Sequence, residues 1–154
     1  MHTKGSRKHS QGFTHSDNPL SCAAGVAVLD YVEANNLVDA AKRRGEYLLN
    51  RLETLRDIDI VGDVRGKGLL LGIEFVADKE TKAPFPAEAG LTARIVTKAF
   101  EMGVFLVAGL GGCADGVHGD QIQISPALVI SEEQIDKVVE IMRVAIEQSA
   151  EEVS

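Results

Sequence analysis

The stretch IDIVGDVRGKGLLLGIEFV, residues 58–76, decides the fold of this chain. Apolar and polar residues alternate from Ile58 to Val64, which is the two-residue period of a strand with one buried face. After Arg65-Gly66-Lys67-Gly68 comes the run Leu69–Val76, whose only charged residue is Glu74. Such a run is typical of a strand that is covered on both faces. The stretch therefore predicts two strands joined by a glycine-containing turn at residues 65–68.

Helical periods lie on both sides of these strands. Apolar residues recur at helical spacing before them, in residues 19–34 and 38–55, and after them, in residues 87–101 and from residue 132 onward. Pro19 stands at a first helical position behind a cap at Asp17 or Asn18, and Ser131-Glu132-Glu133-Gln134 is a capping box. Shorter alternating segments at 104–107 and 121–125 add two strands. The order predicts an α/β fold of the two-layer α+β kind, with a small, mostly antiparallel sheet and helices packed on it.

Composition limits the classes of function. The 154 residues suffice for one core, and residues 1–10 are polar and without period. We therefore expect a disordered or displaced tail at 1–10 and one domain at 11–154. A net charge of -7 without a basic face argues against nucleic acid as a partner. No apolar run approaches the roughly 20 residues that cross a bilayer, so we expect no membrane partner and a cytoplasmic protein.

The segment before the first helix has the local chemistry of an anion site. Thr14 follows Gly12 closely and precedes a helix start, where free N–H groups favour negative charge. Its hydroxyl is either a phosphate ligand or part of a local turn, and the turn is the commoner use of such a residue. His9 and His15 are either acid–base groups or simply solvated side chains.

Other candidate residues have structural explanations. Arg65 either binds an anion or pairs with a carboxylate such as Glu74 or Asp63, and the ion pair is favoured. The glycine-rich segment 109–119 lacks the Lys-Ser/Thr ending of a phosphate loop, so we expect a mobile rim or interface loop there. The sequence offers neither a metal-ligand motif nor a Ser-His-Asp order, and we predict no metal site.

Taken together, the motifs are those of one family. The chain resembles the C-terminal part of a class III (omega-amino acid type) pyridoxal-phosphate-dependent aminotransferase. The resemblance extends from about His9 to the last helix and rests on five motifs in the same order: GFTHSDNPLSCAA (12–24), VRGKGL (64–69), DKETKAPFP (78–86), ADGVHGD (114–120) and ISPALVIS (124–131).

The resemblance implies a cofactor role for Thr14. The matching threonine of the family binds the phosphate of pyridoxal 5'-phosphate, held by the partner subunit of a homodimer, and Gly12 and Phe13 would shape that pocket. The lysine that holds the cofactor covalently lies upstream in the family, within a large domain that is absent here. Lys4 and Lys8 lack its sequence context. The resemblance therefore implies no catalytic residue in this chain, and a homodimer or a missing N-terminal large domain as its partner.

The resemblance also bears on the substrate. Many family members carry an arginine for a substrate carboxylate where this chain has Gln123. This difference indicates amino transfer from an omega-amino acid or an amine to a keto acid such as pyruvate in the full-length protein, with the isolated chain inactive. The alternative is a non-catalytic assembly or ligand-binding module derived from the same domain.

Overall fold

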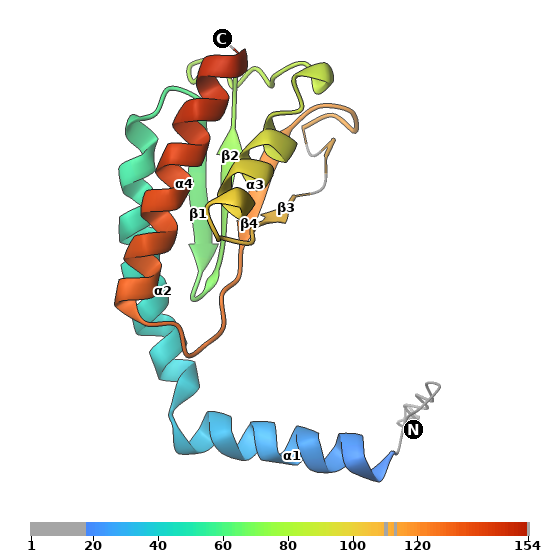
Figure 1. Cartoon of the computed structure of the whole chain (residues 1–154), viewed down its shortest axis with the longest axis vertical. Coiled ribbons are helices and arrows are strands. Elements are labelled where there is room, and N and C mark those ends of the chain that lie inside the picture. The colour runs from blue at the N-terminus through green and yellow to red at the C-terminus, as the bar shows by residue number, and fades with distance from the viewer. Residues whose placement is uncertain (1–17, 110, 113, 154) are drawn as a thin grey trace, which may run out of the picture. The chain divides into compact units, whose positions relative to one another are not determined.

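The computed structural model describes residues 18–109, 111–112 and 114–153 and divides the chain into two compact units, Met1–Asn36 and Leu37–Ser154 (Figure 1). The described part of the first unit is one helix, α1 (Pro19–Ala34). Asn18 Oδ1 accepts hydrogen bonds from the N–H groups of Leu20 at 3.0 Å and Ser21 at 3.4 Å. Asn18 is thus the cap, with Pro19 at the first helical position, and none of the α1 side chains is buried.

The second unit is a two-layer α/β domain. Among its described residues, four strands form one antiparallel sheet in the order β1-β2-β4-β3. This confirms the predicted fold class. The elements are α2 (Leu37–Glu53), a 3₁₀ turn (Thr54–Asp57), β1 (Val61–Lys67), β2 (Leu70–Phe75), a second 3₁₀ turn (Ala87–Ala89), α3 (Leu91–Glu101), β3 (Val107–Ala108), β4 (Asp120–Ile124) and α4 (Glu132–Val153).

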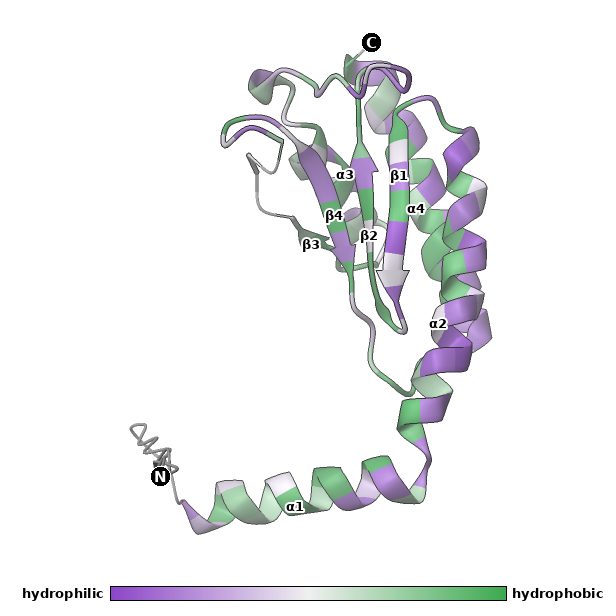
Figure 2. Cartoon of the chain, turned by 180° about the vertical axis from the view of Figure 1, so that it is seen from behind, coloured by the Kyte–Doolittle hydropathy of each residue, from purple (hydrophilic) through white to green (hydrophobic). Residues whose placement is uncertain are grey.

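Helices of the second unit cover one face of the sheet. Figure 1 shows α3 and α4 in front of the strands, and Figure 2, from behind, shows the strands in front of the helices. Aliphatic side chains from both layers fill the core between them, as the shortage of aromatic residues requires. Fully buried examples are Leu52, Leu55, Ile73, Leu91, Ile95, Ile122, Ile135, Met142 and Ile146.

A close backbone contact joins α2 to the β1–β2 turn. A Cβ placed on Gly45 would lie 2.2 Å from the carbonyl oxygen of Gly68, so only glycine fits at this point of α2. Gly68 itself has φ 56°, a left-handed conformation that suits the first position of a two-residue hairpin turn. Two glycines far apart in the sequence therefore set how tightly α2 packs against the hairpin.

Three sequence predictions differ from the structure in their boundaries, and a fourth differs in which residues are buried. Residues 65–67 continue β1 rather than forming a turn, and the turn is Gly68-Leu69. The helix predicted at 87–101 begins at Leu91, because Gly90 adopts φ 59° and separates it from the preceding 3₁₀ turn. Of the strand predicted at 104–107, only Val107 belongs to β3, which ends at Ala108. At the start of α2, Leu37 and Ala40 are buried while Val38 is exposed, which shifts the apolar stripe by one position.

Across the described part of the chain, no helix is both long enough and apolar enough to span a bilayer.

Candidate functional site

Gln123 lies on the face of the sheet opposite the helices. It pairs with Gly72 of β2 on one side and with Val107 of β3 on the other, and Gly72 pairs with Arg65 of β1. Side chains one position along each strand, such as Ile73 and Ile122, are buried. Successive side chains alternate between faces, so this row points away from the core.

A shallow cavity occupies the middle of this row. Gly72 has no side chain, so Arg65 on one side and Gln123 on the other border a depression of about 250 Å³. Leu70 and Gln121 also line it. The lining combines one guanidinium with two side-chain amides and an apolar patch, a surface suited to a small polar molecule with an apolar part.

Arg65 is held by two carboxylates. Its Nη1 donates to Asp63 Oδ2 and to Glu74 Oε2, each at 2.7 Å. These hydrogen bonds, first that to Glu74 and then that to Asp63, raise the pKa of Arg65. Conversely, the hydrogen bonds from Arg65 and then Arg56 lower the pKa of Asp63. The predicted pairing of Arg65 with Glu74 or Asp63 is confirmed, and it involves both. Because two carboxylates offset its charge, Arg65 gives the cavity little attraction for an anion.

Two acidic residues near the glycine-rich loop were missed by the sequence analysis. Asp115 Oδ1 accepts the N–H groups of Val117 and His118, and its Oδ2 lies 2.7 Å from His118 Nδ1. These contacts, led by the His118 N–H, hold the pKa of Asp115 well below its usual range. The local signal was present, because an aspartate in such a loop often binds N–H groups two and three residues later.

Asp120 caps a helix that is distant in the sequence. Its Oδ1 accepts from Thr92 N at 2.9 Å and from Thr92 Oγ1 at 2.7 Å, at the start of α3, where Gly90 provides no side-chain cap. No local sequence pattern links residues 92 and 120. This contact fixes the entry to β4, and with it the position of Gln123.

The other predicted site residues lie outside the part of the chain that the structure describes. These are Gly12, Phe13 and Thr14, the histidines at 9 and 15, and the lysines at 4 and 8. Within the described residues, no group of acidic, histidine or cysteine side chains is arranged to hold a metal ion. The cavity beside Gln123 is not lined by a lysine, and its arginine is engaged by carboxylates. The described residues by themselves therefore do not fit a pyridoxal phosphate site.

Comparison with known proteins gives one family. The profile described as aminotransferase class-III matches residues 2–146. An aminotransferase of Gibberella zeae is 38% identical over 144 residues, which are 92% of this chain and 28% of that protein. The uncharacterized aminotransferase YodT of Bacillus subtilis is 38% identical over 139 residues, 90% of this chain and 31% of that protein.

Solved structures agree with the sequence matches. A transaminase from the marine bacterium Virgibacillus superposes with a TM-score of 0.85 at 30% identity, over 94% of this chain and 32% of that one. An (S)-enantioselective omega-transaminase from Thermomicrobium roseum gives 0.79 at 33% identity, over 93% and 30%. The chain thus spans less than a third of each of these four proteins.

Proposed function

This chain belongs to the class III aminotransferase family, and from that premise we propose that it acts as the C-terminal part of a pyridoxal-phosphate-dependent transaminase. Residues 11–154 form the C-terminal domain of that enzyme, and the lysine-bearing large domain is a separate part of it. In the complete enzyme the reaction is amino transfer from an omega-amino acid or an amine to a keto acid such as pyruvate. The isolated chain is inactive.

The exposure of α1 carries this proposal. Leu20 is 80% exposed and Leu29 is 65% exposed, and Val26, Val28 and Tyr31 are also exposed. A helix that is apolar on most sides is normally buried in a folded protein. Relatives have more than two thirds of their length outside the matched region. That additional polypeptide, or the partner subunit of a homodimer, would cover α1 and remove its apolar side chains from water.

The chain's contribution to cofactor binding rests on Thr14. Its hydroxyl donates to the phosphate of pyridoxal phosphate held by the partner subunit, and Gly12 and Phe13 shape the space around it. Bound pyridoxal phosphate supplies the electron sink of amino transfer. The helix that follows this segment in the sequence, α1, has its N-terminus capped by Asn18.

Gln123 faces the substrate in this proposal. Its side chain is neutral, and the neighbouring guanidinium of Arg65 is offset by Asp63 and Glu74. A cavity of this kind gives a substrate carboxylate no strong partner, so an amine, or an omega-amino acid whose carboxylate is bound elsewhere, is favoured as the donor.

Reconstitution tests the proposal. The chain is mixed with a separately produced polypeptide comprising the part of Bacillus subtilis YodT that lies outside the matched region, and transamination of an amine with pyruvate is followed. We expect activity only in the mixture. Thr14→Ala should weaken pyridoxal phosphate binding about 10-fold or more, since a hydrogen bond to a charged group contributes roughly 1.5–3 kcal/mol. Thr97→Ala, an exposed threonine on α3, is the matched control.

Two other outcomes of the reconstitution would contradict the proposal. Turnover by the chain alone would refute the proposal that the lysine-bearing part is needed. A stable complex that binds pyridoxal phosphate without turnover would favour the alternative, a non-catalytic assembly or ligand-binding module.

A further inference from the structure

The two edges of the sheet differ in whether side chains bond to their outward-facing backbone groups. At the β1 edge, Arg56 Nη2 donates to the carbonyl of Val64 at 2.9 Å, and Lys82 Nζ donates to the carbonyl of Gly62 at 3.0 Å. Asp78 shapes the loop that carries Lys82, because its Oδ1 accepts the N–H groups of Glu80 and Thr81. Exposed sheet edges invite pairing with further strands, and charged side chains are a common means of blocking them. The β1 edge is blocked in this way.

The β3 edge is open. In residues 18–109, 111–112 and 114–153, Val107 and Ala108 pair with β4 and with no second strand. Gly109 N donates to Gln121 O at 2.9 Å, and bonding alternates along an antiparallel pair, so Ala108 turns its N–H and C=O away from β4. Within the described residues, no side chain bonds to these two groups. An edge that offers a free donor and acceptor can take an added strand.

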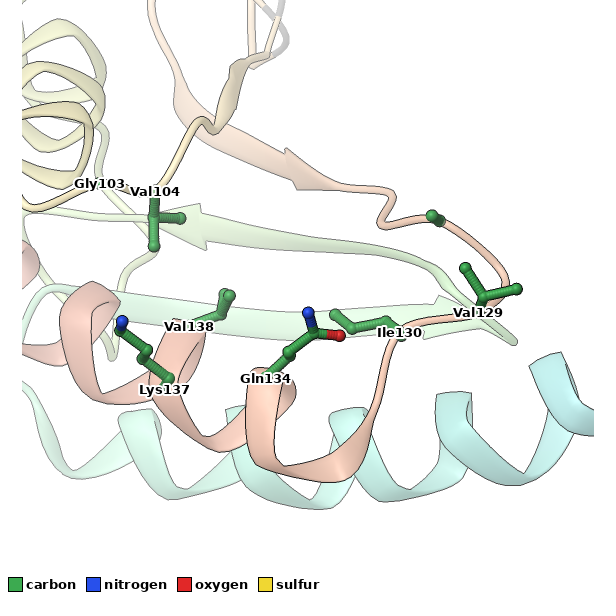
Figure 3. Close-up of a pocket in the computed structure, with 8 residues that line it drawn as sticks. Gly103, Val104, Val129, Ile130, Gln134, Lys137 and Val138 are labelled. Carbon is green, nitrogen blue, oxygen red and sulfur yellow. The ribbon is translucent and has the colours of Figure 1, made fainter.

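An apolar groove runs beside this open edge. The groove comprises two neighbouring cavities, of about 460 Å³ and about 280 Å³, which share Val104, Ile130 and Val138 as lining residues. Figure 3 shows the larger one, with Val104 on the segment before β3 and with Gln134, Lys137 and Val138 rising from α4. The groove is built before anything binds, because Arg44 Nη1 holds the Leu128 carbonyl at 2.7 Å and Gln134 accepts from Ser131 N.

Exposed apolar side chains gather around the groove. Phe105 is 78% exposed and makes an edge-to-face contact with the exposed Phe100, at 6.5 Å between ring centres. Val107, which lines the smaller cavity, and Val129, which lines the larger one, are also exposed. Apolar surface concentrated at one place is a feature of interaction sites, whereas scattered apolar residues are ordinary.

We propose that the β3 edge and this groove bind an extended, apolar segment from the part of the aminotransferase that lies outside this chain. The segment adds a strand to β3 through Ala108 and places alternate apolar side chains over Val104 and Ile130. The inference rests on the proposed function and adds the place and manner of attachment. The relatives carry more than two thirds of their length outside the matched region, and that polypeptide is the source of the segment.

Amide hydrogen exchange locates the contact. The probe is the YodT polypeptide from outside the matched region, mixed with the unmodified chain, and exchange is measured residue by residue. We expect the Ala108 amide to exchange at least about tenfold more slowly in the complex, with no change at the β1 edge. Phe105→Lys and Val129→Lys should each weaken binding at least about tenfold. Val144→Lys should not, because Val144 is also exposed but does not line the groove. Unchanged melting temperatures of the three variants show that the fold is intact.

The results separate this inference from the proposed function. Restored transamination with no protection of Ala108 and no effect of the two groove variants would overturn the groove and leave the proposed function standing. Absence of any complex would overturn both. Protection of Ala108 in the chain alone, rising with concentration and lost in Val129→Lys, would also overturn the proposal, because it would identify a second copy as the occupant.

Discussion

The helices α1 and α4 both carry many apolar side chains, but only α4 buries such side chains within this chain. In α4, Ile135, Met142 and Ile146 are fully buried against the sheet and the other helices, and polar residues occupy the outer face. In α1 the apolar residues are distributed around the helix and none is buried. Because most helical stability in proteins comes from packing of an apolar face, α4 is stabilised by its own chain, whereas α1 depends on additional polypeptide.

The largest expected difference comes from truncating one apolar side chain to alanine in each of the two helices. Ile146→Ala in α4 should lower the free energy of unfolding of the isolated chain by about 2–5 kcal/mol, because it leaves a cavity in the core. Leu29→Ala in α1 should change it by less than about 0.5 kcal/mol, because Leu29 is exposed. Chemical denaturation of both variants measures the difference. A large loss from Leu29→Ala would mean that α1 is already packed in the isolated chain.

A pair of glycine substitutions should give effects of opposite sign. Gly45→Ala in α2 places a Cβ against the backbone of Gly68 and should destabilise the second unit by about 3 kcal/mol. Apart from its chain neighbours and the nearby backbone of α1, no described atom lies within 4 Å of a Cβ on Gly25, so Gly25→Ala should stabilise α1 by up to about 1 kcal/mol through helix propensity. Denaturation curves measure the first effect, and amide exchange within α1 measures the second. If Gly45→Ala were neutral, the close contact with the hairpin turn would be wrong.

Helix caps give a smaller contrast. Asp120→Ala removes the side chain that bonds Thr92 at the start of α3 and should cost about 1–2 kcal/mol of global stability. Asn18→Ala removes the cap of α1 and should reduce only the helicity of α1, seen by circular dichroism, with the unfolding midpoint of the second unit unchanged. Equal shifts of that midpoint in both variants would show that the two units unfold together.

The smallest expected effect is a pH dependence confined to the second unit. The pKa of Asp63 is lowered in the folded state by hydrogen bonds from Arg65 and Arg56. Its carboxylate therefore contributes stability at pH values above its ordinary pKa of about 3.9, and this contribution is lost as the pH falls below that value through the folded pKa. Asp63→Asn should flatten the loss of stability in this acidic range. Asp59→Asn, at an exposed position, serves as the control. The same acid sensitivity in both variants would contradict the role of Asp63.

Features that depend on neighbouring residues could be predicted from the sequence. Asn18 and the Ser131–Gln134 box act within a few residues, so their hydrogen bonds follow from the sequence pattern. The pairing of Arg65 with Asp63 and Glu74 was also predictable, because a hairpin places residues 65 and 63 beside residue 74. The start of α3 was predicted wrongly. The apolar pattern indicated one helix from residue 87, but Gly90 adopts a left-handed conformation and α3 begins after it.

Features that join distant residues could not be predicted. Asp120 at the start of α3, Lys82 on the β1 edge and Gly45 against Gly68 each involve partners many residues apart. Of the candidate site, the position of Gln123 in β4 was predicted, but not the row that Arg65, Gly72 and Gln123 form across three strands.

The sequence by itself determined the helical and strand periods, the local caps and the ordered motifs of the aminotransferase family, because each is written in residues that are neighbours or follow in a fixed order. Only the tertiary structure decided which sheet edge is blocked and which is open, and which apolar residues remain exposed on α1 and around the β3 groove. The physical reason is that burial and edge pairing depend on which surfaces meet in space, and an apolar residue has the same identity in a sequence whether its partner lies in its own chain or elsewhere.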